Sequence, residues 1–138
     1  MTSADFRTRR LAMGKTQRQL ADLLGVSLRA LHSFEQGWRK VPVHVERQVL
    51  FVTMLARRAN QPVAACWKIR RCPSHIRKGC PAWELKAGQF CWFINGTICQ
   101  GQSHRTWGDK MQICRDCKVF LAAVGPAASA DDIAPPES

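Results

Sequence analysis

Residues 16–37 read TQRQLADLLGVSLRALHSFEQG, and this stretch predicts two short helices joined by a turn. Thr16 is suited to cap the first helix, and the leucines and alanine that follow it recur at spacings that form one apolar stripe. Gly25 comes directly after the last leucine and can adopt the left-handed conformation that ends a helix. Ser27 can then cap a second helix, which ends at Gly37.

The second of these helices has two distinct faces. Its apolar residues recur at helical spacing and form the face that we expect to be buried: Ala30, Leu31 and Phe34. Its other side chains are polar and are expected to face outward: Arg29, His32, Ser33 and Gln36. An amphipathic helix of this kind packs on its own domain and leaves the polar face free for a partner.

Two segments, TQRQLADLLGVS and LHSFEQGWRKVP, resemble the helix-turn-helix of the Cro/repressor (XRE) family, because they carry its Gln-x-x-Leu-Ala, Gly-Val-Ser and Glu-x-Gly landmarks. In that fold the second helix lies in the major groove of DNA. The resemblance implies that the start of this helix contacts bases through Leu28, Arg29 and Ser33, with His32 as a further candidate. It places four other residues where the family contacts phosphates: Gln17, Ser27, Arg39 and Lys40.

Arg29 is the strongest candidate for base recognition, because an arginine can donate two hydrogen bonds to one guanine. Leu28 departs from the polar residue usual at its position and offers only apolar contact, for instance with a thymine methyl group. Gln17 and Ser27 lie at or next to helix N-termini, where unpaired amides and the helix dipole favour anions. The alternative is an amphipathic helix pair that does not contact DNA, followed by a solvated basic turn.

Two further helices are expected to complete a bundle of four to five helices over residues 1–60. Residues 5–13 are expected to turn Phe6, Leu11 and Ala12 inward and Arg7, Arg9 and Arg10 outward. A longer helix over residues 42–60 is expected to bury a stripe formed by Val45, Val49, Val52, Leu55 and Ala56. It ends before Pro62, since proline disfavours helix in the residue that precedes it.

The formal net charge of +11 is spread over both halves of the chain. Residues 1–65 hold 11 Lys/Arg against 4 Asp/Glu, and residues 66–124 hold 10 against 3. A basic surface of this extent suits nucleic-acid phosphates and predicts an affinity that falls with salt. Nothing resembles a targeting or membrane segment, so we expect a cytoplasmic protein. Residues 125–138 are rich in Ala and Pro and are expected to form a disordered tail.

All seven cysteines lie within residues 66–117, and Cys-Trp opens each half of a weak repeat, at Cys66 and at Cys91. With the segments CWKIRRCP, GCPAW, FCWFINGTICQG and CRDCKVF, this region resembles the bacterial two-CW cysteine-rich domain, a small module attached to regulatory and signalling proteins. The resemblance implies a module over residues 66–124 after a linker at 61–65, and it implies no particular cofactor. Four tryptophans are expected to pack around the cysteines: Trp67, Trp83, Trp92 and Trp107.

Domains of this size usually need a staple such as a metal, and cysteines clustered in a reducing compartment are more often metal ligands than disulfides. All seven are therefore candidate ligands: Cys66, Cys72, Cys80, Cys91, Cys99, Cys114 and Cys117. The last two form a pair that can chelate an ion from one turn, with Arg115 and Lys118 favouring the thiolate. His75 and His104 are expected to be surface residues.

Three chemistries are open for these cysteines. An iron–sulfur cluster is favoured, because most of the cysteines are scattered singly and two of them, Cys72 and Cys80, precede proline. Zinc is the alternative, since four Cys or His ligands complete a closed tetrahedron. Disulfide formation or thiol switching is the third.

The sequence therefore predicts a mainly α protein, with a helix-turn-helix domain and a small irregular cysteine-rich module. We expect a transcriptional regulator that binds double-stranded DNA as a homodimer, because one such helix reads too few bases for useful specificity. Its cysteine-rich domain is expected to bind a metal centre and to sense redox or iron status. The alternative is an interaction or adaptor protein with a purely structural zinc. No enzymatic activity is expected, since Cys114 and Cys117 lack the strand and helix of a thioredoxin motif.

Overall fold

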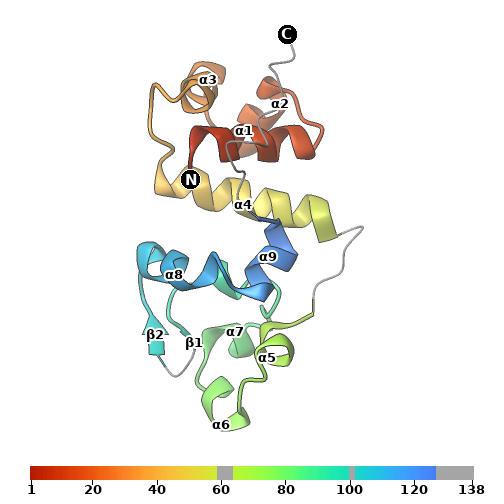
Figure 1. Cartoon of the computed structure of the whole chain (residues 1–138), viewed down its shortest axis with the longest axis vertical. Helices are drawn as coiled ribbons and strands as arrows, with labels where there is room; N and C mark the ends of the chain where they lie inside the picture. The colour runs from red at the N-terminus through yellow and green to blue at the C-terminus, as the bar shows by residue number, and fades with distance from the viewer. Residues whose placement is uncertain (59–63, 100–101, 127–138) are drawn as a thin grey trace. The chain divides into compact units, whose positions relative to one another are not determined.

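The computed structural model of the chain describes residues 1–58, 64–99 and 102–126 (Figure 1). They are mainly helical and divide into two compact units, Met1–Ala56 and Arg57–Pro126. The predicted fold class, mainly α with a small irregular cysteine-rich part, is confirmed. Three predicted features lie wholly or partly outside the described residues: the end of the 42–60 helix, most of the 61–65 linker, and residues 127–138 of the tail.

The first unit contains α1 (Ser3–Ala12), α2 (Gln17–Leu24), α3 (Leu28–Gln36) and α4 (Val43–Arg58), the last of which extends two residues beyond the unit. Both α1 and α2 pack against α3. Their shared core is apolar and almost fully buried: Phe6, Leu20, Ala21, Leu24, Leu31, Phe34, Val41, Val45 and Val49. The Phe6 and Phe34 rings meet edge to face with their centroids 5.9 Å apart, so α1 and α3 are joined through the centre of this core.

The predicted helix boundaries around the turn are confirmed by their caps. Thr16 and Gln19 form a capping box, in which the Gln19 N–H donates to Thr16 Oγ1 at 3.1 Å and the Thr16 N–H donates to Gln19 Oε1 at 3.0 Å. Gly25 ends α2 with φ +67°, and Ser27 Oγ caps α3 by accepting from the Ala30 N–H at 3.0 Å. Local side-chain chemistry therefore fixes where α2 stops and α3 starts.

The predicted faces of α1 and α4 were partly wrong. Arg9 and Arg10 are buried, at 5 % and 9 % exposure, because each pairs with a carboxylate. Leu11 lies at 38 % exposure and Ala12 is also exposed, although both were expected to be buried.

In α4, Val45 and Val49 are buried as predicted, but the stripe continues through Leu50, Thr53 and Met54. Leu55 and Ala56 are exposed. Thr53 can lie in this buried stripe because its hydroxyl donates to the Val49 carbonyl at 2.7 Å.

The second unit is built from short elements. They are α5 (Cys66–Ile69), α6 (Ser74–Arg77), α7 (Pro81–Glu84), the 3-10 helix η1 (Cys91–Phe93), β1 (Thr97–Cys99), β2 (Gln102–His104), α8 (Trp107–Cys114) and α9 (Lys118–Val124). The two strands pair in antiparallel fashion, with Thr97 opposite His104 and Cys99 opposite Gln102. Six of the seven cysteines lie within these elements or, for Cys80 and Cys117, cap one of them. The architecture therefore brings cysteines from distant positions into one small unit.

Tryptophans hold the second unit together, as predicted. Trp92 is fully buried, and its ring lies 5.4 Å from that of Phe120 and 6.4 Å from that of Trp107. Trp67 and Trp83 form a second pair at 4.9 Å. The two Cys-Trp motifs thus sit in two different aromatic clusters.

Gly88 links the two halves of the repeat. Its carbonyl accepts a 2.8 Å hydrogen bond from the Cys66 N–H. A Cβ atom at position 88 would lie 2.7 Å from Ala65 Cβ and 2.8 Å from Trp67 Cζ3, closer than such atoms can approach. Only a residue without a side chain fits this contact.

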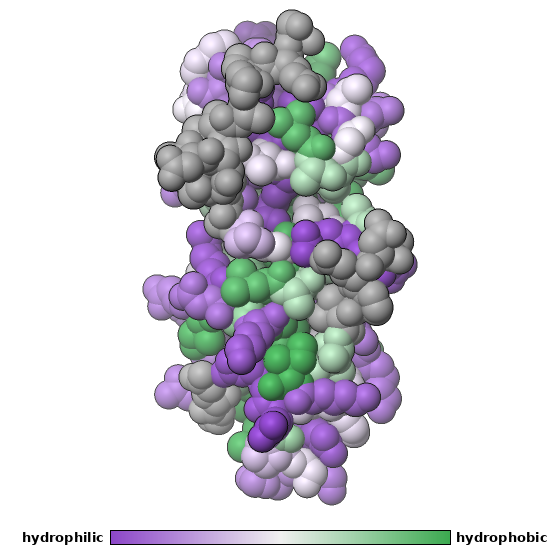
Figure 2. All heavy atoms as spheres, turned by 45° about the vertical axis from the view of Figure 1, so that its right-hand side comes forward, coloured by the Kyte–Doolittle hydropathy of each residue, from purple (hydrophilic) through white to green (hydrophobic). Residues whose placement is uncertain are grey.

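No helix of the described residues is long and apolar enough to cross a membrane. The space-filling view shows hydrophilic residues over much of the visible face, with smaller apolar patches among them (Figure 2).

Candidate nucleic-acid interface and cysteine cluster

The polar face of α3 is exposed at Arg29 and Gln36 and half-buried at His32 and Ser33. Arg29 is exposed, and Leu28, at the first position of the helix, is 39 % exposed. Ser33 lies one turn after Arg29, and its hydroxyl donates to the Arg29 carbonyl at 3.0 Å, which leaves its lone pairs free to accept. The N-terminal half of α3 can therefore offer one guanidinium, one hydroxyl and one apolar side chain to a base edge.

Two other predicted DNA contacts already have partners within the unit. His32 is half-buried, and its ring packs edge to face against Trp38 with the centroids 5.4 Å apart. Arg39 is exposed, and its guanidinium carbon lies 5.3 Å from the centre of the Phe34 ring. Lys40 is exposed. The basic turn after α3 is therefore anchored on one side by an aromatic contact.

Gln17 contacts a buried ion pair. Its Nε2 donates to Glu35 Oε2 at 2.8 Å, and Glu35 also accepts from Arg10, at 3.2 Å for the Nη2 contact. Arg10 Nη1 donates in addition to the Lys15 carbonyl at 3.0 Å. This network joins the start of α2 to the end of α3, so the amide of Gln17 serves to position the motif.

An open groove beside α3 carries cationic side chains that the family landmarks did not single out. Its volume is about 710 Å³, and its lining includes Arg7, Lys15 and Arg18 together with Leu28 and Gln36. Lys15 and Arg18 are exposed and flank the cap of α2. The excess of positive charge in residues 1–65 was the sequence signal for these residues, but charge alone could not say which lysines and arginines share a groove.

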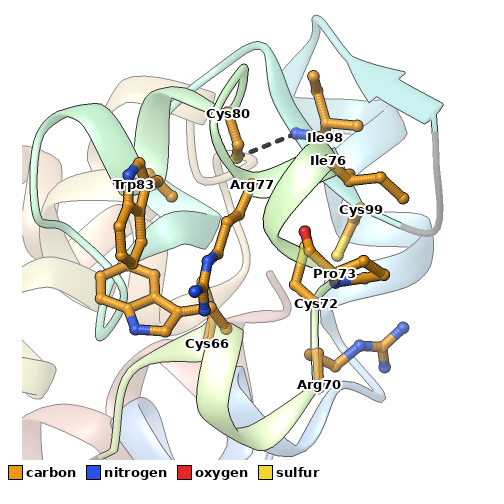
Figure 3. Close-up of a pocket in the computed structure, with 12 residues that line it drawn as sticks. Cys66, Arg70, Cys72, Pro73, Ile76, Arg77, Cys80, Trp83, Ile98 and Cys99 are labelled. Atoms are coloured by element: carbon orange, nitrogen blue, oxygen red, sulfur yellow. Dashed lines mark hydrogen bonds between the residues drawn. The ribbon is translucent and has the colours of Figure 1, made fainter.

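In the second unit, the cysteines line two cavities that share three of them. The larger cavity has a volume of about 170 Å³ and is lined by four cysteines, Cys66, Cys72, Cys80 and Cys99 (Figure 3). These cysteines come from α5, from the segments before α6 and α7, and from β1. The Ile98 N–H donates to Cys80 Sγ at 3.3 Å. Four cysteines from four separate segments thus line one space.

The smaller cavity, of about 40 Å³, is lined by six cysteines: Cys66, Cys80, Cys91, Cys99, Cys114 and Cys117. Two cations also line it. Lys110 is 1 % exposed, and its ammonium donates to the Thr97 hydroxyl, while Arg70 Nη1 lies 4.0 Å from Cys117 Sγ. The interior of this unit therefore combines thiols with positive charge.

The thiols differ in their ionisation. A hydrogen bond from Cys91 lowers the pKa of Cys66 to about 7, and the same contact, followed by burial, raises the pKa of Cys91 far above its usual range. Burial raises the pKa of Cys114 to about 11, and it also raises the pKa of Cys72 and of Cys99. Among the five cysteines whose pKa is shifted, Cys66 is therefore the one that favours the thiolate at neutral pH, whereas the sequence had pointed to Cys114.

All seven cysteines are free thiols. Within residues 1–58, 64–99 and 102–126, no group of three or more His, Cys, Asp or Glu side chains is placed to hold a metal ion. His75 is exposed as expected, but His104 is buried at 7 % exposure. The prediction that His104 is a surface residue was wrong, because β2 turns its ring inward to the Cys99 carbonyl, 3.4 Å from Nε2.

Comparison with protein families matches residues 6–43 to a family described as Helix-turn-helix. The matched segment contains α2 and α3 in full, together with the caps, the ion pair and the exposed face described above. Neither a curated protein nor a solved structure matches the chain. The resemblance of the cysteine-rich region to the two-CW domain stays a prediction. Residues 6–43 are thus similar to an XRE-type helix-turn-helix domain, and this similarity supports a DNA-binding transcription regulator.

Proposed function

We propose that this chain regulates transcription by sequence-specific binding of double-stranded DNA, with α3 in the major groove. The observation that carries the proposal is the exposed start of α3, where Leu28 and Arg29 face outward from a buried core and Ser33 follows, half-buried, one turn later. Arg29 reads guanine through two donors, Leu28 contacts an apolar base edge, and Ser33 accepts one hydrogen bond. His32 and Trp38 form the apolar flank of this reading face.

Phosphate contacts position this helix on the duplex. The basic groove contributes Lys15 and Arg18, and the turn after α3 contributes Arg39 and Lys40. The unpaired backbone amides at the start of α3, next to Ser27, add a favourable site for a phosphate. These groups supply affinity without sequence preference, so their contribution falls as salt rises.

The regulator acts as a homodimer, because a single α3 contacts only a few base pairs. Its cysteine-rich unit binds a metal centre that senses redox or iron status. If the metal centre binds one dimer arrangement more tightly than another, its binding changes the affinity of the dimer for a two-fold operator. Operator binding then changes the affinity for the metal centre by the same factor.

The test begins with selection of preferred sites from random duplex DNA by the full-length protein. Affinity is then measured for the selected site and for each single base change. Arg29→Ala is expected to lose about 1–3 kcal/mol of discrimination at one base pair, roughly 5- to 150-fold, and to relax specificity there. Arg18→Ala is expected to weaken binding to all sequences alike and to reduce the salt dependence by about one phosphate contact.

Arg105→Ala is the matched control, since it removes one exposed arginine from the cysteine-rich unit. It is expected to leave the sequence preference unchanged. Failure to enrich any DNA sequence, or an Arg29→Ala protein with unaltered specificity, would contradict the proposal. The first result favours an interaction or adaptor protein instead.

A further inference from the structure

The division of the seven cysteines between two cavities narrows the choice of metal ligands. Four of them line the larger cavity, whereas Cys91, Cys114 and Cys117 line only the smaller one. The larger set includes both cysteines that precede proline, Cys72 and Cys80. Four is the number of thiolates that holds an iron–sulfur cluster.

The spacing of the sulfurs separates a cluster from a single ion. A structural zinc needs four sulfurs about 2.3 Å from one point, so the sulfurs themselves must nearly touch. No three ligand side chains of the described residues gather in this way. A cluster instead keeps its four cysteines apart, because iron and sulfide ions fill the space between them. Cysteines set around a cavity of about 170 Å³ match the second arrangement.

The walls of the larger cavity suit an anionic centre, because they combine apolar side chains with positive charge. Its apolar lining comes mainly from Trp67, Trp83, Ile76, Ile98, Pro73 and Ala82, and its charged lining consists of the two arginines Arg70 and Arg77. Arg77 is held in place by its position 4.5 Å from the Trp83 ring (Figure 3). The Ile98 N–H points to Cys80 Sγ, and hydrogen bonds to sulfur are a main means by which proteins stabilise and tune clusters.

We propose that the larger cavity of the cysteine-rich unit holds an iron–sulfur cluster ligated by Cys66, Cys72, Cys80 and Cys99. This inference rests on the proposed metal centre and deepens it by naming the site, the ligands and the kind of centre. The two arginines offset the negative charge of the four thiolates, and the aromatic side chains give the cavity an apolar wall. Cys91, Cys114 and Cys117 are then structural thiols of the smaller cavity.

The test uses the full-length protein, loaded without oxygen with ferrous iron and sulfide. The wild-type protein is expected to become brown, with a broad visible absorption and with equal amounts of iron and acid-labile sulfide. Cys72→Ser is the lead variant, because Cys72 is half-buried and its thiol makes only a 3.8 Å contact with the Pro73 carbonyl. It is expected to weaken retention of the cluster by more than the roughly 10- to 100-fold that loss of an outer-shell partner costs.

Cys114→Ser is the matched control and is expected to keep both colour and iron, since Cys114 lines only the smaller cavity. A second measurement needs no variant: loading should protect Cys72 of the wild-type protein from alkylation. The inference is overturned if the wild-type protein is colourless and holds zinc, or holds no metal. It is also overturned if Cys72→Ser keeps its iron undiminished, or if Cys72 of the loaded protein still reacts. DNA binding is measured separately, so a protein that selects its operator but forms no cluster refutes the cluster alone and leaves the proposed DNA binding standing.

Discussion

Removing the charge of Glu35 should strongly destabilise the helix-turn-helix. The Glu35 side chain is 2 % exposed and faces Arg10, whose side chain is 11 % exposed. In a Glu35→Gln protein the guanidinium stays buried without a counter-charge, which typically costs about 3–5 kcal/mol. The free energy of unfolding of a small domain is roughly 5–15 kcal/mol, so the loss is a large part of it. Since every 1.4 kcal/mol is a factor of about ten, the unfolded fraction of the unit would rise at least about 100-fold.

The assay is native-state hydrogen exchange of the α3 amides in the full-length protein, which reports the stability of this unit alone. An Arg10→Met, Glu35→Met double variant removes both charges and should recover most of the loss, because apolar replacement of a whole buried pair is often neutral or stabilising. Gln17 then loses its acceptor, but it is half-exposed and can turn to water. A Glu35→Gln protein within about 1 kcal/mol of wild type, or a double variant as unstable as the two single changes added together, would refute the reasoning.

Three further predictions follow from single positions. Gly25→Ala should cost about 1–2 kcal/mol in thermal unfolding from backbone conformation alone, because φ is +67° and nothing lies within 4 Å of the added Cβ; an unchanged midpoint contradicts this. Trp92→Ala should cost about 3–5 kcal/mol in urea unfolding of the cysteine-rich unit, since its ring is fully buried. In the metal-free chain, the alkylation rate of Cys66 should rise with pH and reach half its maximum near pH 7, whereas that of Cys114 should do so near pH 11. A Cys66 midpoint at the ordinary value of 9.0 would contradict this.

The parts of the fold that were predictable from the sequence are those that local chemistry determines. Thr16, Gly25 and Ser27 act within one helical turn of their own positions, so their roles as caps follow from residue type and spacing. The exposed face of α3 follows equally from helical periodicity. The same local rules predicted the outward face of α3, and the family resemblance places the base contacts on that face.

Contacts between residues distant in sequence could not be predicted in the same way. Arg10 looks like a solvated arginine until Glu35, 25 residues later, is known to lie beside it. Helical periodicity wrongly predicted that Leu11 is buried, because it could not show these ion pairs. Buried ion pairs occupy part of the inner face of α1 where apolar side chains were expected.

The secondary structure of the cysteine-rich unit could not be predicted from the sequence, because its elements are only three to eight residues long and carry no clear periodicity. Spacing alone made Cys114 and Cys117 the natural chelating pair. The larger cavity excludes both and gathers cysteines from α5, the segments before α6 and α7, and β1. Which thiols share a cavity depends on loop paths that no local pattern encodes.

The close contact at Gly88 has a consequence for how such chains can diverge. Any side chain at position 88 collides with the Cβ of Ala65 and the ring of Trp67, and these two residues flank the first Cys-Trp cysteine. A descendant could therefore change position 88 only after position 65 had become glycine and the tryptophan had moved. We therefore expect position 88 to remain glycine in related proteins, while exposed neighbours such as Gln89 vary freely. A glycine without any chemical role would then be as invariant among relatives as the cysteines.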